Sequence, residues 1–189
     1  RLLLSLILII SFTAEIKASH VPGGNITYEN IGPNTFVVTL TVYEDCGTAF
    51  MGNTAQTVMV SNSCGLSSPN INLPNVVFQD EVSQLCLQMI GQSECNGGGF
   101  PGVYMHVWRD TITLPGGCDS WVFAWDGCCR NNSVNSPGAS NNYYWETVLN
   151  SVTAPSNSSP VITSQPIPYN CNNQPVIYNF GVYEPDGDS

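Results

Sequence analysis

Eight cysteines are the residues of this chain whose type and number most clearly indicate a chemistry. They are Cys46, Cys64, Cys86, Cys95, Cys118, Cys128, Cys129 and Cys171. An even number of cysteines in an exported chain predicts disulfide bonds, because oxidising compartments stabilise them. Zinc binding is the competing interpretation, but the sequence has no Cys-x-x-Cys pair and only two histidines, His20 and His106. We therefore expect a disulfide framework.

The spacing of the cysteines limits their pairing only in part. Cys128 and Cys129 are neighbours in sequence, about 3.8 Å apart at Cα. Disulfides usually need about 4.4 to 6.8 Å between Cα atoms, so these two are expected to bond to other partners. Cys86 and Cys95 bracket a short loop that contains a glycine, and we predict them as a local pair. The remaining connectivity stays open.

Three carboxylates near the C-terminus are candidate metal ligands. Glu184, Asp186 and Asp188 alternate with Pro185 and Gly187, and the glycine permits a tight turn. Hard carboxylate oxygens at this spacing suit Ca²⁺. The alternative is a solvated acidic turn that binds no ion.

Four tryptophans allow two interpretations. An exposed row of Trp108, Trp121, Trp125 and Trp145 would stack on sugar rings, as in a carbohydrate-binding module. Each of them, however, lies in an alternating segment with apolar neighbours, which favours the core of a β-sandwich.

The sequence shows little that indicates catalysis. It has no Gly-x-Ser-x-Gly, His-Glu-x-x-His or Asp-[Ser/Thr]-Gly motif. His106 lies between Met105 and Val107 in a strand-like run, which favours a structural histidine over a general base. A pair of carboxylates for glycoside hydrolysis is a three-dimensional property, and no spacing here selects two of them. We predict no enzymatic activity.

The composition of the chain limits the classes of partner that it can bind. The 189 residues include 4 Lys+Arg against 14 Asp+Glu, a net charge of -10, and only 10% are charged. That fraction is less than half of the roughly 25% usual for globular chains, so the surface is expected to be polar and uncharged. The few cations cannot neutralise a phosphate backbone, which excludes nucleic acid as a partner. Anionic membrane surfaces and phosphorylated ligands are disfavoured for the same reason.

The first residues resemble an export signal. Leu2 to Phe12 form an apolar run of signal-peptide length behind Arg1, and cleavage is expected after Ala18. The run is too short for a stable membrane span. Residues 1–18 are therefore predicted as a signal peptide, and the protein as secreted or displayed at the cell surface.

Alternation of apolar and polar residues predicts the elements that carry these side chains. Asn25 to Asn30 and Thr35 to Tyr43 are expected to form a hairpin across a Gly-Pro-Asn turn. Further strands are expected at Val103 to Leu114, with a bulge near Arg109 and Asp110, at Ser120 to Asp126, buried on both faces, and at Tyr143 to Val152. No amphipathic helix is found, so the fold class is an antiparallel, all-β sandwich of the Ig-like or jelly-roll-like type.

Changes in composition suggest the domain limits. Residues 19–154 are expected to form the disulfide-braced sandwich. Residues 155–160, rich in Ser, Asn and Pro, are expected to be a linker, and residues 161–189 to be the truncated start of an Ig-like or cadherin-like module.

Several motifs resemble one family of proteins. The segments are Ser19-His20, Gly23 to Tyr28, Thr41 to Cys46, Trp125 to Asn131, and Pro166 to Pro175 continuing to Pro185 to Ser189. They are similar to the N-terminal region of large secreted surface proteins of Bacteroidota, the PKD-repeat or gliding-motility-associated C-terminal-domain proteins. Asn25 and Glu44 depart from the family, in which these positions are more often acidic and basic.

The resemblance implies a modular extracellular β protein with an adhesive or architectural role. Its expected partners are downstream modules of the same chain and a cell-surface or extracellular polymer such as a glycan. The alternative is a carbohydrate-binding module of a secreted multidomain protein, and a glycoside hydrolase is the least favoured interpretation. No motif identifies the ligand.

Overall fold

The computed structural model describes residues 21–47, 51–128, 142–167, 173 and 175–187, and this part of the chain is all-β. It contains no α-helix, only the short 3-10 helices η1 (Ile90–Gln92) and η2 (Glu94–Asn96). Its strands are β1 (Gly23–Gly32), β2 (Thr35–Asp45), β3 (Gln56–Asn62), β4 (Ile71–Leu73), β5 (Asn75–Glu81), β6 (Val103–Thr113), β7 (Trp121–Gly127), β8 (Tyr143–Leu149), β9 (Val161–Ile162) and β10 (Val182–Tyr183).

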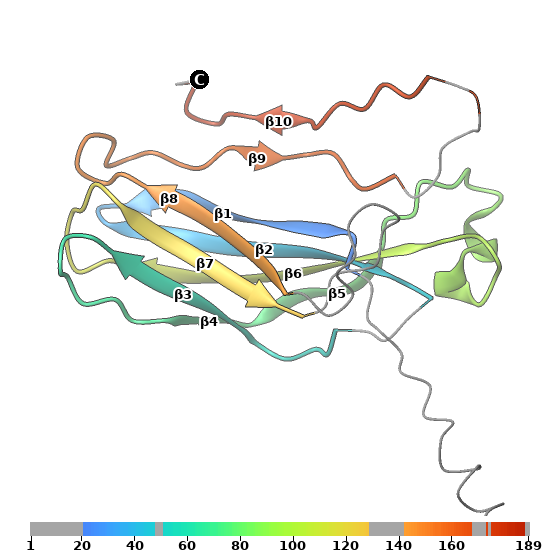
Figure 1. Ribbon diagram of the computed structural model, residues 1–189, viewed down its shortest axis with the longest axis horizontal. Coiled ribbons are helices and arrows are strands. Elements are labelled where there is room, and N and C mark those ends of the chain that lie inside the picture. Colours follow the sequence, from blue (N-terminus) through green and yellow to red (C-terminus); the bar gives the residue numbers. More distant parts are fainter. Residues whose placement is uncertain (1–20, 48–50, 129–141, 168–172, 174, 188–189) are drawn as a thin grey trace, which may run out of the picture.

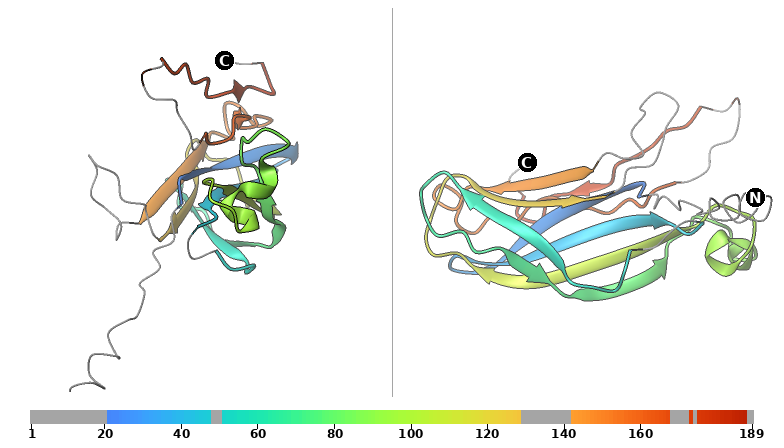
Figure 2. Two further views of the ribbon diagram at one scale, coloured as in Figure 1. Left: turned by 90° about the vertical axis from the view of Figure 1, so that its right-hand side faces the viewer. Right: turned by 60° about the horizontal axis from the view of Figure 1, so that its bottom comes forward.

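Eight of these strands form two antiparallel sheets that pack face to face (Figures 1 and 2). The first sheet has the order β1-β2-β6-β5 and the second the order β4-β3-β7-β8. If the strands are lettered A, B, C, C′, D, E, F and G along the chain, these orders are A-B-E-D and C′-C-F-G. This is the strand order of an immunoglobulin-type sandwich. The predicted fold class is therefore confirmed.

The first hairpin forms where the alternating pattern predicts it. β1 pairs with β2 in antiparallel register, with Ile26 opposite Leu40 and Tyr28 opposite Val38. Asn34 in the connecting turn has a φ of 51°, a conformation that asparagine tolerates better than most residues. Alternate residues of β2 therefore face inward and outward along its whole length.

The predicted bulge in the strand after Val103 is wrong. β6 pairs with β2 without interruption, and Arg109 and Asp110 lie opposite Thr39 and Val38. The register shifts are on the other side of β6, within β5, where Gln79 has a φ of 54°. The polar Arg-Asp pair in an apolar run indicated a phase shift, but both side chains are exposed near the end of a regular strand.

The core lies between the two sheets. The first sheet contributes Phe36, Val38, Leu40 and Trp108, and the second contributes Val58, Trp121, Phe123 and Leu149, all fully buried. On β7 the face of Trp121, Phe123 and Trp125 is buried as predicted. On its opposite face Ala124 is buried but Val122 is only half-buried, so the prediction of a strand buried on both faces holds in part.

Two disulfides in which both cysteines are described brace the sandwich. Cys46, just after β2, bonds to Cys95 in the loop between β5 and β6, and Cys64, just after β3, bonds to Cys118 ahead of β7. Cys46 precedes β3 and Cys64 follows it, so the two cysteines lie at opposite ends of this strand. The two bridges therefore hold loops at opposite ends of the sandwich. Each closes a loop of about 50 residues, for which chain entropy predicts a stabilisation of about 4 kcal/mol.

The predicted Cys86–Cys95 pair is wrong, because Cys95 bonds to Cys46 and Cys86 is an exposed free thiol. Proximity in sequence favoured the local pair, but the sheet brings the end of β2 next to the loop that carries Cys95. Cys128 is also disulfide-bonded. Cys129 and Cys171 lie outside the described residues, so the expectations for them stay predictions.

The C-terminal part of the chain runs beside β1, the edge strand of the first sheet (Figure 1). Residues 155–160, expected to be a linker, are docked on β1: the Ser159 backbone N–H donates to the Tyr28 carbonyl at 2.8 Å, and the Tyr28 N–H donates to Ser159 Oγ at 2.8 Å. Beyond them β9 and β10 pair as a small two-stranded sheet outside the two layers (Figure 2). The limits of a second module stay a prediction.

Candidate functional site

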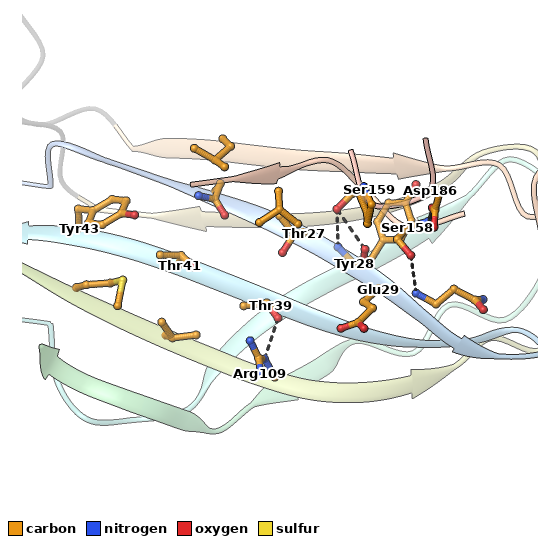
Figure 3. Close-up of a pocket in the computed structure, with 17 residues that line it drawn as sticks. Thr27, Tyr28, Glu29, Thr39, Thr41, Tyr43, Arg109, Ser158, Ser159 and Asp186 are labelled. Carbon is orange, nitrogen blue, oxygen red and sulfur yellow. Dashed lines mark hydrogen bonds between the residues drawn. The ribbon is translucent and has the colours of Figure 1, made fainter. Parts of the chain in front are cut away.

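A polar groove lies between the outer face of the first sheet and the C-terminal segment (Figure 3). Strands β1, β2 and β6 line one side, and residues 158–162 with 185–186 line the other. We call this cavity of about 590 Å³ the outer groove; its volume falls within the roughly 300–1,000 Å³ typical of ligand sites. Hydroxyl or amide residues of the lining are Asn25, Thr27, Asn30, Thr39, Thr41, Tyr43, Ser158 and Ser159, and apolar ones are Met105, Val107, Val161, Ile162 and Pro185.

The register of the sheet places these side chains in rows across the strands. Thr27 lies opposite Thr39, and Thr39 lies opposite Arg109. The next row begins with Asn25 opposite Thr41. Because apolar residues occupy the alternate positions of β2 and turn inward, its threonines must face outward, into the outer groove.

Arg109 is the cation of the outer groove. Its Nε donates to Thr39 Oγ1 at 3.1 Å, and the side chain is otherwise exposed. Within the part of the chain that the structure describes it is the only Lys or Arg, and no described carboxylate lies within 4.0 Å of it. The Nη groups of its guanidinium therefore have no carboxylate partner here, although Glu29 and Asp186 line the same groove.

The opposite side of the outer groove is fixed by hydrogen bonds to the sheet edge. Ser158 Oγ accepts from the Asn30 N–H at 3.2 Å, beside the Ser159 contacts with Tyr28. The Asp186 carboxylate in turn accepts from the Ser158 N–H (Figure 3). Segments about 130 residues apart in sequence thus form one site.

Tyr43 closes one end of the outer groove. Burial raises the pKa of the Tyr43 hydroxyl above its ordinary value, and the Tyr178 hydroxyl adds to the rise. Tyr43 is therefore a neutral hydrogen-bonding group near neutral pH.

A second polar cluster is buried inside the sandwich. His106 Nε2 lies 2.9 Å from Glu44 Oε2, and both side chains have essentially no exposure. Glu44 Oε1 accepts from the Met51 N–H at 2.6 Å, and Trp108 Nε1 donates to the Thr54 carbonyl at 2.8 Å. The pair thus anchors the connection between β2 and β3.

The position of His106 agrees with a structural role. Its ring packs between Phe78 and Trp108, at centroid distances of 5.2 and 5.7 Å. Its Nδ1 has no hydrogen-bond partner. A substrate in solvent cannot reach a fully buried imidazole, so this pair is a fold element in the described state.

The candidate calcium ligands are engaged in local hydrogen bonds. Asp186 binds the Ser158 N–H, and Glu184 Oε1 accepts from the Asp186 N–H at 3.2 Å. Asp188 lies outside the described residues, so Ca²⁺ binding by the three stays a prediction. Another close group, Cys64, Cys118 and Asp119, contains the sulfurs of a disulfide, which are not thiolate ligands.

The tryptophans belong to the core, as the preferred interpretation predicted. Trp108, Trp121 and Trp125 are buried, and the half-buried Trp145 stacks on Trp125 at 5.0 Å. Gly24 lies beneath Trp145, where a Cβ would come within 2.4 Å of the indole ring. The alternative Trp platform for sugars does not form.

Neither the outer groove nor the Glu44–His106 pair was predicted from the sequence. The inward phase of β2 runs through Phe36, Val38, Leu40 and Val42, and one further step reaches Glu44. The inward phase of β2 is therefore the sequence signal that the Glu44 carboxylate is buried. Alternation along Thr35 to Tyr43 places the threonines of β2 on the outward face, but no sequence signal indicates that residues near 158 and 186 cover them.

None of the protein-family models, curated proteins or solved structures compared with the chain matches it. Across the residues that the structure describes, no helix combines the length and the apolar character needed to cross a membrane.

Proposed function

We propose that the chain is a non-catalytic extracellular module of a large cell-surface or secreted adhesin-like protein, with a structural and adhesive role. The observation that carries this proposal is the pair of disulfides that hold loops at both ends of the sandwich. Such bridges persist in oxidising compartments and are rare in the cytosol. The polar surface with few charges and the apolar leader support the same location.

Export and surface exposure are the test of this proposal. The chain with its leader is produced in a Bacteroidota host, and intact cells are treated with protease. We expect a mature N-terminus near Ser19 and protein that is found in the medium or degraded on intact cells. Protein that keeps its leader and is protected until lysis would contradict the proposal, and so would a hydrolase activity that co-purifies with the chain.

A second candidate function is carbohydrate binding, and the outer groove favours it. Hydroxyl and amide groups both donate and accept hydrogen bonds, as sugar hydroxyls do. Binding of oligosaccharides to the purified mature protein, measured by a glycan array and calorimetry, tests this candidate. Binding that Thr41→Val weakens, while Thr57→Val on the other sheet does not, would locate the sugar in the outer groove.

A further inference from the structure

We propose that the outer groove binds a uronic acid residue of an extracellular polysaccharide, with the guanidinium of Arg109 holding its carboxylate. The proposal rests on the carbohydrate-binding candidate above and names the class of sugar. Three features carry it: the state of Arg109, the hydroxyl-rich lining around it, and the carboxylates at the rim.

Arg109 is oriented by the protein but not neutralised by it. The bond from Nε to Thr39 Oγ1 fixes the plane of the guanidinium, and no described carboxylate lies within 4.0 Å. This is unexpected in a chain with 14 acidic residues and a net charge of -10, where carboxylates are abundant. A guanidinium whose Nη groups remain free matches the planar geometry of a carboxylate, which it binds through two parallel hydrogen bonds.

The groups around Arg109 suit a sugar better than a peptide. Thr27 lies in the same row as Thr39 and Arg109, and Thr41 lies in the next row with Asn25. The hydroxyls of Ser158 and Ser159 are buried and bonded to the backbone of β1, so the threonines are the hydroxyls open to a ligand. Hydroxyls with both donor and acceptor capacity complement the ring hydroxyls of a saccharide. A peptide that adds a strand to a sheet needs a free strand edge, and Ser159 already occupies the edge of β1 at Tyr28.

The acidic residues of the outer groove restrict how much negative charge the ligand can carry. Glu29 and Asp186 line the same cavity as Arg109. A densely charged polyanion would place further carboxylates near them, and like charges repel. The favoured ligand is therefore a single uronic acid residue flanked by neutral sugars.

The test compares a ligand with and without its carboxylate. The probe is aldotriouronic acid, a glucuronosyl xylobiose, and the matched control is its carboxyl-reduced neutral counterpart. Isothermal titration calorimetry with the mature, disulfide-bonded protein measures both. We expect the acidic probe to bind at least about tenfold more tightly, in keeping with a charge-assisted pair.

Variants of residues in the outer groove test where the carboxylate of the acidic probe binds. Arg109→Gln is expected to abolish the preference for the acidic probe, and Arg109→Lys, which keeps the charge but loses the fork, to retain only part of it. Glu29→Gln removes a negative charge that repels the acidic probe. It is expected to increase the affinity for the acidic probe severalfold without changing the affinity for the neutral one. Glu146→Gln, the same substitution on the exposed face of β8, is expected to change neither.

Thr39 is a positioning residue in this scheme. Thr39→Val removes the acceptor for Nε and is expected to lower the ratio of acidic to neutral affinity, whereas Thr39→Ser preserves it. Thermal unfolding of every variant verifies that the fold is retained. A purely structural role of Thr39 would weaken both probes equally.

The outcomes separate this inference from the carbohydrate-binding candidate. Equal affinity for the two probes, or a preference that survives Arg109→Gln, would overturn the inference and leave carbohydrate binding intact. No binding of either probe or of any arrayed glycan would overturn both. Displacement of the acidic probe by a short peptide with a free C-terminal carboxylate, at similar concentration, would overturn the assignment to a saccharide.

Discussion

The sandwich and the C-terminal segment, residues 161–187, contain similar apolar residues in opposite surroundings. In the sandwich, Phe36, Leu40 and Phe123 are fully buried between two sheets. In residues 161–187, Ile177 is 96% exposed and Phe180 is 71% exposed. Composition alone does not distinguish the two regions.

The difference shows what burial requires in a β protein. A sheet hides an apolar face only against a second layer, and β9 with β10 forms a two-stranded ribbon without one. β1 to β8 supply two facing sheets and two disulfides. The apolar side chains of residues 161–187 therefore stay exposed, and the second module expected to begin there stays a prediction.

The largest effect is expected from the same substitution made in each region. Phe123→Ala removes a fully buried ring from the core and should lower the free energy of unfolding by about 3–5 kcal/mol. Phe180→Ala should change it by less than about 0.5 kcal/mol, because the ring is already in solvent. Urea unfolding of the oxidised protein measures both. Equal losses would contradict the contrast between the regions.

The disulfides should come next. Cys46→Ser with Cys95→Ser removes one bridge and is expected to lower the unfolding free energy by about 4 kcal/mol. Cys86→Ser alters an exposed free thiol and should be neutral within about 0.5 kcal/mol. Thermal unfolding compares them, and peptide mapping without reductant verifies the bridge. A destabilising Cys86→Ser would indicate that this thiol has a bonded role.

Substitutions of two serines test where the sandwich ends and the C-terminal segment begins. Ser159→Ala leaves the Tyr28 N–H without its acceptor and should cost about 1–3 kcal/mol. Ser156→Ala, at an exposed position of the same segment, should have little effect. Chemical unfolding of both variants shows whether residues 155–160 belong to the sandwich. If they form a free linker, the two substitutions will be equally mild.

The smallest effect concerns Tyr43, where the two regions meet. Its pKa is raised in the folded state, first by burial and then by Tyr178, so stability is fully present below the unfolded pKa of about 10 and is lost as pH rises through the folded pKa. Tyr43→Phe should reduce this alkaline loss, and Tyr178→Phe should lower the pKa of Tyr43 slightly. Ultraviolet titration and urea unfolding above pH ~8 measure both. A midpoint at the ordinary tyrosine value would contradict the raised pKa of Tyr43.

Local patterns predicted the strands whose alternation is long and apolar. Thr35 to Tyr43 and Ser120 to Asp126 alternate over many residues, and both became central strands. β4 has three residues and β5 carries register shifts, so neither has a pattern that a single sequence reveals. Their position depends on pairing with β3 and β6, which lie far from them or across a turn.

The candidate site was predictable only in its parts. The outward phase of Thr39 and Thr41 follows from the inward phase of Leu40 and Val42. The guanidinium of Arg109 joins Thr39 because two strands 70 residues apart pair in one register. The predicted phase shift at Arg109 would have moved that side chain to the wrong face.

The sequence by itself determined the chemistry of the chain: an all-β pattern, cysteines for disulfides, a polar surface with few cations, and tryptophans for the core. The tertiary structure decided which of these residues meet. It paired Cys46 with Cys95 and left Cys86 free, buried Glu44 against His106, and closed the outer groove with Ser158 and Asp186. Alternation is a local property of the backbone, whereas partners between strands depend on sheet order and register, which only the packed fold defines.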